Sequence, residues 1–171
     1  MTIIAATGHR PQRLGGFDNR TRLALGGLAT EYLSRERPEK VIVGMALGWD
    51  QAVAGAAWAL DIPFIAAVPF PGQPDRWPEE ARILYHWLLE QAESVHYICA
   101  STQILSPRQV TDLMRYRNQW MVDNCTKVVA LYDGTFGGTA QTVSYAAEKG
   151  IPVDNLWRRW SLDVETRALL A

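Results

Sequence analysis

Short apolar segments and longer helical segments alternate five times along the chain, and this alternation limits the fold more than any other feature. The apolar segments cover approximately residues 2–7, 41–43, 63–68, 95–99 and 127–132. Each is too short for a helix, and four of them run into loops rich in glycine, proline or polar residues. Strands that alternate with helices favour a parallel sheet with helices on both faces. We therefore expect a three-layer α/β sandwich with a mostly parallel sheet of five or six strands.

Capping residues and prolines mark the expected helix boundaries. Asn19 can cap a helix that runs to about residue 35, and we place Leu23, Leu28 and Tyr32 among its inward positions. A short sixth strand is expected near Pro152. Further helices are expected over approximately residues 51–60, 78–91, 106–125 and 138–149.

The length and composition of the chain fit one domain. It has 171 residues, of which 48% are apolar, enough for a single hydrophobic core. We assign residues 1–155 to this domain. Residues 156–171 form a C-terminal tail with Trp157 and Trp160, which could pack on the domain or form a contact in a homo-oligomer.

The charge balance argues against a broad electrostatic footprint. Lys and Arg total 17 against 18 Asp and Glu, a net charge of −1, so neither nucleic acid nor an anionic membrane is expected as a partner. Cys99 and Cys125 lack the companions of a metal site, and we expect no metal and no cofactor. The N-terminus has no basic leader, and no apolar run reaches the roughly 18 residues needed to span a bilayer. These features predict a cytoplasmic protein.

A glycine loop follows the strand at residues 127–132. The strand stops at Asp133, and the next helix opens through Gly137, Gly138 and Thr139. Glycines let backbone N–H groups approach a ligand, and the positive end of a helix dipole favours an anion. A phosphate group is the natural guest, although a Gly-Gly pair before a helix is also a plain tight turn.

The loop after the first strand is basic. His9 and Arg10 directly follow Gly8, and Arg13 and Arg20 come soon after. Such clustering suits an anion, although a basic loop could also be simply solvated.

The loops after the second and third strands are also unusual. The second strand ends in GMALGWD, which contains Gly44, Gly48 and Asp50. Asp50 could cap the following helix, contact ligand hydroxyls, or do both. The third strand ends in PFPGQPDRW, which must be a loop, and its Trp77 could be a packing residue or a stacking platform.

Arg117 is expected on the inward face of the longest helix. It lies four residues after Leu113 and four before Met121, within an apolar stripe. An unpaired buried charge costs several kcal/mol, so the guanidinium needs either an internal carboxylate or a bound anion. Because ligands of parallel sheets bind beyond the carboxyl ends of the strands, we expect Arg117 and the loops to form one composite anion site.

Several spaced motifs resemble a single protein family. They are TGHRP, GMALGWD, PFPGQPDRW, SPRQV, RNQWMVDNC and LYDG, in this order. Over residues 2 to about 153 the chain resembles the YpsA-like family of the SLOG superfamily. The resemblance implies a Rossmann-like fold, related to the LOG phosphoribohydrolases, DprA and the molybdenum cofactor carriers. It also implies a nucleotide-like ligand at the glycine loops.

The LOG enzymes share only part of their catalytic pattern with this chain. An arginine in their RKxxM motif and the glutamate of PGGxGTxxE carry cleavage of the base from the ribose phosphate. Here Arg117 and Met121 match the first motif, and residues 137–139 match part of the second. Thr142 or Ser144 takes the place of the glutamate, and neither can stabilise an oxocarbenium ion as a carboxylate would.

Three functions are therefore open. The first is a sensor, carrier or sequestering protein for a nucleotide or nucleotide-derived ligand, such as an ADP-ribose or NAD derivative. The second is an N-glycosidic hydrolase or transferase on nucleoside 5′-phosphates, in which Asp50 or Asp133 would act together with Arg117. The third is DprA-like binding of single-stranded DNA, against which the net charge argues. For the small-molecule site we also include Asn118, next to Arg117.

Overall fold

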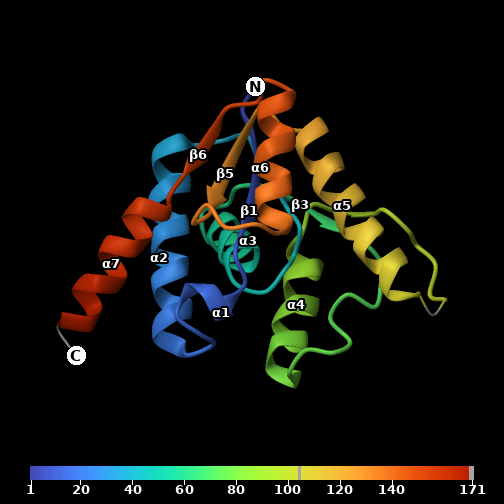
Figure 1. Cartoon of the computed structure of the whole chain (residues 1–171), viewed down its shortest axis with the longest axis horizontal. Coiled ribbons are helices and arrows are strands. Elements are labelled where there is room, and N and C mark those ends of the chain that lie inside the picture. Colours follow the sequence, from blue (N-terminus) through green and yellow to red (C-terminus); the bar gives the residue numbers. More distant parts are fainter. Residues whose placement is uncertain (104, 170–171) are drawn as a thin grey trace.

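The computed structural model describes residues 1–103 and 105–169, and its strands form one six-stranded sheet (Figure 1). The strand order is β4-β3-β2-β1-β5-β6, and every pairing is parallel. The predicted parallel sheet is confirmed, with the larger of the two predicted strand numbers. The strands are β1 Ile3–Gly8, β2 Lys40–Val43, β3 Phe64–Val68, β4 Ser94–Tyr97, β5 Lys127–Leu131 and β6 Val153–Asn155.

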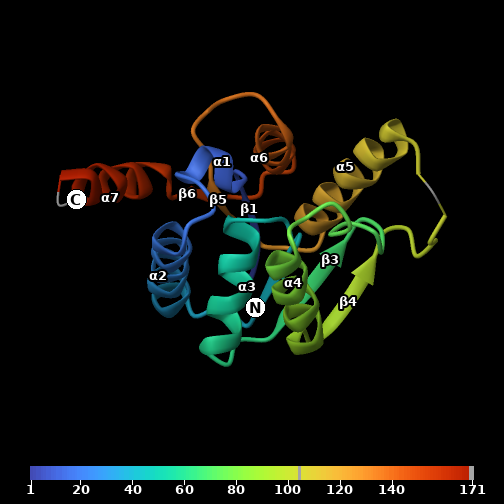
Figure 2. The same cartoon turned by 90° about the horizontal axis from the view of Figure 1, so that it is seen from below.

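Helices connect these strands and cover both faces of the sheet, so the fold is the expected Rossmann-like α/β sandwich. Figure 2 shows α2, α3 and α4 in a row on one side of the sheet, with α5 and α6 on the other. The helices are α1 Pro11–Leu14, α2 Asn19–Glu36, α3 Trp49–Ala59, α4 Glu79–Gln91, α5 Pro107–Asp123, α6 Gly138–Glu148 and α7 Trp157–Leu169.

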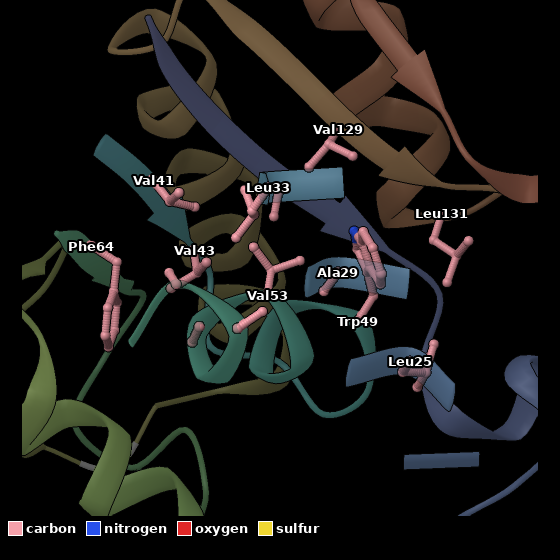
Figure 3. Packing of buried hydrophobic residues seen from close by; sticks show 14 of the residues in the cluster. Leu25, Ala29, Leu33, Val41, Val43, Trp49, Val53, Phe64, Val129 and Leu131 are labelled. Atoms are coloured by element: carbon pink, nitrogen blue, oxygen red, sulfur yellow. The ribbon is translucent and has the colours of Figure 1, made fainter. Parts of the chain in front are cut away.

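Two hydrophobic clusters fill the space between the layers. Successive side chains of a strand point to opposite faces, so Ile4 and Ala6 of β1 join one cluster and Ala5 joins the other. The larger cluster lies under α2, α3 and α4, and Figure 3 shows Leu25 of α2 and Val53 of α3 within it. The smaller cluster packs under α5 and α6.

Strand β1 is the point where the connections of the sheet change direction. It lies between β2 and β5, and the chain leaves β1 toward α2 on one face and β5 toward α6 on the other. A crevice therefore opens beyond the carboxyl ends of β1 and β5. Ligands of open α/β sheets bind in such crevices, outside the carboxyl ends of the strands.

Helix α2 differs from the prediction at its start and on its inward face. Asp18, not Asn19, is the N-cap, because its carboxylate accepts a hydrogen bond of 2.7 Å from the Thr21 N–H. Leu28 and Tyr32 are buried as predicted, but Leu23 is 77% exposed, so its placement in the core was wrong. Buried Leu25 follows two residues later, and two residues turn the helix by about 200°.

The two ends of α5 have different surroundings. Met121 and Val122, in its C-terminal half, are buried in the smaller cluster. Val110 and Met114, in its N-terminal half, are only half-buried. The predicted apolar stripe therefore faces the core over part of its length, and its first turns face cavities.

The C-terminal segment forms α7. Trp160 is 2% exposed and belongs to the larger cluster, and Arg159 forms an ion pair of 3.3 Å with Glu31 of α2. The segment thus packs on the rest of the chain through Trp160. The division at residue 155 and an oligomer contact stay predictions.

Candidate functional site

A cavity of about 450 Å³ lies beyond the carboxyl ends of β1 and β5 and is called the switch-point cavity here. The end of β1, α1, the loop before α3, the inward side of α5 and the start of α6 all contribute to its lining. Most of the residues predicted for the ligand site line it: Gly8, His9, Arg10, Asp50, Arg117, Asn118, Gly137, Gly138 and Thr139.

Arg117 is the most deeply buried cation of the cavity, with 6% of its surface exposed. Its Nη1 donates to the carbonyl oxygen of Gly44, and its Nε donates to Oδ1 of Asn118 at 2.8 Å. Both acceptors are neutral. No carboxylate oxygen of the described residues lies within 4 Å of the guanidinium nitrogens, the limit for an ion pair. The alternative of an internal salt bridge is therefore not realised.

Asp50 lies in the first turn of α3 and is 5% exposed. Burial raises the pKa of its carboxyl from 3.8 to about 6, although the Arg117 charge and a hydrogen bond from the Ala46 N–H act in the opposite direction. Gly48 is the N-cap of α3, so of the two roles left open for Asp50 the helix cap is not realised. The helix begins two residues earlier than expected, which turns the Asp50 carboxylate toward the cavity instead.

Gly44 and Gly48 do not line the cavity but shape its wall. A Cβ at Gly44 would lie 2.9 Å from Oδ2 of Asp50 and 2.5 Å from the guanidinium carbon of Arg117, so any other residue here would displace one of these two buried groups. Gly48 has φ +94°, in the region that glycine favours, and this conformation opens α3.

Gly8 lines the cavity and lies directly against the side chain of Trp49. A Cβ at this position would lie 2.6 Å from Cδ1 of the indole, so β1 and α3 can approach this closely only with a glycine. Trp49 is fully buried, and its indole N–H has no hydrogen-bond partner in the described part of the chain.

Asp133 does not line the cavity, but it contacts His9, which does. Its Oδ1 lies 2.6 Å from Nε2 of His9, and its own backbone N–H lies 3.1 Å from the same nitrogen. Partial burial acts to raise the pKa of Asp133, but hydrogen bonds from Thr135 and His9 outweigh it and lower the pKa to about 2. Asp133 thus orients the His9 ring, which does line the cavity, and does not itself reach the ligand space.

The start of α6 presents backbone donors to the cavity. The first N–H groups of a helix have no partner within it, and the N-cap residue Gly137 has no side chain to satisfy them. Thr142 is one of the two residues that could take the place of the LOG glutamate. Its hydroxyl donates a hydrogen bond of 2.9 Å to the Gly138 carbonyl oxygen. Thr142 and Ser144 both lie outside the switch-point cavity, on the side of α6 that faces α5.

Sequence reasoning missed several lining residues. Met114 precedes Arg117 by one helical turn, so the same periodicity that placed Arg117 could have found it. Arg13, which was expected in the basic loop after the first strand, also lines the cavity; it lies in the short helix α1, which was not expected, and donates to the Thr135 hydroxyl. The other missed lining residues are Thr7, Gln12, Ala46 and Phe136.

The fold and the cavity define a Rossmann-like protein with a composite polar site at the switch point of its sheet. A sequence profile described as the YspA SLOG family (YpsA) matches residues 4–152. The chain belongs to this family, and the resemblance inferred from its motifs is confirmed.

Two relatives illustrate the family. The chain is similar to the SPbeta prophage-derived protein YoqJ of Bacillus subtilis, with 29% identity across 75% of this chain and 80% of YoqJ. It is also similar to a UPF0398 protein of Bacillus thuringiensis, with 27% identity across 91% of this chain and 87% of that protein.

Solved structures of the same fold include two DNA processing proteins. DprA from Streptococcus pneumoniae gives a TM-score of 0.63 at 17% identity, and the match covers 89% of this chain but only about half, 49%, of that chain. DprA from Helicobacter pylori, solved for its single-stranded DNA binding mode, gives 0.62 at 15% identity over 89% of this chain and 63% of that chain. The protein TM1055 gives 0.58 at 15% identity over 90% and 72%.

Membrane-spanning helices and metal-binding clusters are both missing from the described residues. None of their helices is both long and apolar enough to cross a membrane. The described residues also contain no group of three or more His, Cys, Asp or Glu side chains that could hold a metal ion.

Proposed function

We propose that the chain binds a nucleotide or nucleotide-derived ligand, such as an ADP-ribose or NAD derivative, in the switch-point cavity. In this role it is a sensor, carrier or sequestering protein. The observation that carries the proposal is the charge of the cavity. Three arginines and one aspartate line it, a formal charge of +2 (3 − 1) in a protein whose net charge is −1. Concentrated positive charge in a concave polar site favours a phosphorylated ligand.

The parts of such a ligand have matching groups in the cavity. A phosphate fits the free N–H groups at the start of α6, with Arg10 and Arg117 as counter-charges. Asp50 can accept hydrogen bonds from ribose hydroxyls when it is ionised. Since Arg117 has no carboxylate within ion-pair distance among the described residues, a bound phosphate would provide it with a direct ion pair.

A ligand panel tests this proposal. Thermal unfolding is measured with AMP, ADP-ribose, NAD and inorganic phosphate, each added separately. A ligand at 100 times its Kd stabilises by about 2.7 kcal/mol, which corresponds to roughly 5–10 °C in the melting temperature for a chain of this size. At least one nucleotide should produce such a shift. The absence of stabilisation by every member would contradict the proposal.

A second candidate function is cleavage of an N-glycosidic bond in a nucleoside 5′-phosphate. Asp50 favours it, because a buried carboxyl with a pKa of about 6 lines the same cavity as Arg117. A carboxylate beside the ribose could stabilise an oxocarbenium-like transition state. Asp133 suits this role less well, since it lies outside the lining and its charge is engaged by His9 and Thr135.

Chromatography separates the second function from simple binding. The protein is incubated with AMP, and free adenine is measured over time for the wild type and for Asp50→Asn. An enzyme would release adenine, and the variant would lose release while it still binds AMP. Tight binding without any release by the wild type would rule the enzyme out.

Single-stranded DNA is a weaker candidate, and only the likeness to DprA favours it. The net charge of −1 argues against a phosphate-driven mode, because such binding depends on many Lys and Arg contacts. Fluorescence anisotropy with a labelled oligonucleotide at about 50 and 200 mM salt tests it. Binding that weakens steeply between these concentrations would support DNA as a partner.

A further inference from the structure

A second cavity lies next to the first and is larger. It has a volume of about 720 Å³, lies between the loop of residues 70–77 and the start of α5, and is called the loop cavity here. Met114 lines both this cavity and the switch-point cavity. The two cavities therefore share a wall, formed by one side chain of α5.

The lining of the loop cavity is mixed and carries no net charge, whereas the switch-point cavity is cationic; aromatic and aliphatic side chains lie beside the polar residues Gln73, Ser101, Thr102 and Gln103. Phe70, Trp77 and Val110 line it, and the chain covers each of them only in part. The charged side chains of its lining, Asp75 and Arg76, are exposed and opposite in sign. The chain leaves these apolar side chains half exposed. Covering the exposed part with an apolar group of a ligand would therefore favour binding.

Hydrogen bonds and ring packing hold in place the wall of the loop cavity that residues 70–77 form. The backbone N–H of Trp77 donates to the Pro74 carbonyl at 2.9 Å, and the backbone N–H of Gln73 donates to the Phe70 carbonyl at 3.2 Å. The Trp77 ring packs edge-to-face on Tyr85, with a centroid distance of 5.5 Å and an interplanar angle of 88°. Because this surface is formed before any ligand arrives, binding need not order it.

The spacing along α5 relates the two cavities. Val110 in the loop cavity and Arg117 in the switch-point cavity are seven residues apart, or about 10 Å along the helix axis. Met114 lies between them, and its sulfur is 4.0 Å from Nη2 of Arg117. A ligand lying along this side of α5 would meet a cation at one end and an apolar surface at the other.

We propose that the loop cavity takes the aromatic base of a nucleoside phosphate whose phosphate lies in the switch-point cavity. A nucleoside phosphate has this polarity, with an anionic end, a hydroxylated sugar and a planar aromatic end. The inference rests on the proposed function and narrows it. The base contributes to affinity, so the ligand class is nucleoside phosphates and not sugar phosphates or inorganic phosphate.

Calorimetric titrations with two probes test this assignment. AMP carries the base, and ribose 5-phosphate lacks it. The wild type should bind AMP about tenfold or more tightly than ribose 5-phosphate, as expected for one base packed on aromatic and apolar side chains. Val110→Trp fills the loop cavity and should remove this difference without weakening ribose 5-phosphate. Ser101→Trp fills the cavity from the other side at an exposed position, and it serves if Val110→Trp does not fold.

The outcomes separate this inference from the proposed function. Two results would show that the base does not lie in the loop cavity. Either the wild type binds AMP and ribose 5-phosphate equally, or both filled variants keep the full preference for AMP. The proposal that the chain binds a nucleotide would still stand. If the wild type binds neither AMP nor ribose 5-phosphate, the assignment of the base fails, and the proposed function fails with it when ADP-ribose and NAD do not stabilise the protein either. Gly138→Val, which obstructs the start of α6 and leaves the loop cavity intact, should weaken both probes together.

Discussion

Gln73 and Arg117 donate hydrogen bonds to the same acceptor, the carbonyl oxygen of Gly44. The bond from Nε2 of Gln73 measures 3.1 Å, and Oε1 of Gln73 in turn accepts from the Tyr85 hydroxyl at 3.2 Å. Gln73 lies in the loop of residues 70–77, which does not line the switch-point cavity. The orientation of the buried guanidinium therefore depends on a loop outside the cavity, through a carbonyl group that both side chains hold.

Replacing Gln73 by leucine should destabilise the protein and also weaken its binding of AMP. The substitution leaves the buried Tyr85 hydroxyl without its acceptor, which costs about 1–3 kcal/mol. In urea unfolding, Gln73→Leu combined with Tyr85→Phe should cost less than the sum of the two single changes, because the double variant leaves no unsatisfied group on this pair. Strictly additive costs would mean that the Gln73–Tyr85 bond contributes nothing.

Replacing Arg117 by methionine should reduce the affinity for AMP by about 10- to 100-fold, which is the value of a hydrogen bond to a charged group. Arg115 provides a control on the same helix, since it is exposed and pairs with Asp112 at 3.0 Å. Arg115→Met should bind AMP as the wild type does. Titration calorimetry measures both variants, and circular dichroism verifies that they fold. Equal affinities for the two variants would show that the anion site lies elsewhere.

Two glycine-to-alanine changes should have effects of opposite sign on the free energy of unfolding. Gly44→Ala places a methyl group against Arg117 and Asp50 and should cost about 1–3 kcal/mol through overpacking. Gly26→Ala lies within α2, where nothing occupies the space within 4 Å of a new Cβ, and should gain about 0.5–1 kcal/mol. Urea unfolding of both variants measures the two effects. A stable Gly44→Ala protein with intact AMP binding would contradict the geometry around the guanidinium.

The titration of Asp50 should make the folded state less stable as the pH rises from about 4 to 6. Burial raises its pKa from 3.8 to about 6, so between these values the folded protein binds more protons than the unfolded chain. The contribution of the protonated carboxyl is fully present below about pH 4 and is lost as the pH rises through 6. The loss amounts to about 2–3 kcal/mol, since one pKa unit corresponds to about 1.4 kcal/mol.

Asp50→Asn isolates this effect in urea unfolding between pH 4 and pH 7.5. The difference in free energy of unfolding between the variant and the wild type should shift in favour of the variant as the pH rises, then level off above pH 6. Asp133→Asn is the control. The pKa of Asp133 is lowered to about 2, so its contribution to stability is lost only as the pH falls below about 4. A pH-independent difference for Asp50→Asn would contradict the buried, protonated carboxyl.

The sheet and the inward position of Arg117 could be predicted because both follow from local periodicity. Short apolar runs define buried strands, and the four-residue spacing from Leu113 to Arg117 to Met121 defines one helix face. The same reasoning failed for Leu23. It was placed on the inward face of α2 because it is apolar, but it lies on the exposed face. The buried face of α2 is set by Leu25 and Leu28, and apolar residues outside such a stripe stay exposed.

The partners of the site residues could not be predicted, since they come from distant parts of the chain. Gln73 reaches Gly44 across 29 positions, and Arg117 reaches it across 73. No periodicity encodes such contacts. The start of α3 was placed two residues too late, because Gly48, with φ +94°, caps the helix before its alanine-rich segment begins.

The central position of β1 has a consequence for synthesis on the ribosome. One edge of β1 finds its partner in β2 by residue 43, but its other edge pairs only with β5, which begins at residue 127. While the intervening segment is being made, an apolar strand with unpaired N–H and C=O groups lies at the edge of an unfinished sheet. Such an edge is prone to pair with another nascent chain, and parallel pairing across long sequence distances is slow. Efficient production of this protein should therefore depend on protection of that edge until β5 has emerged.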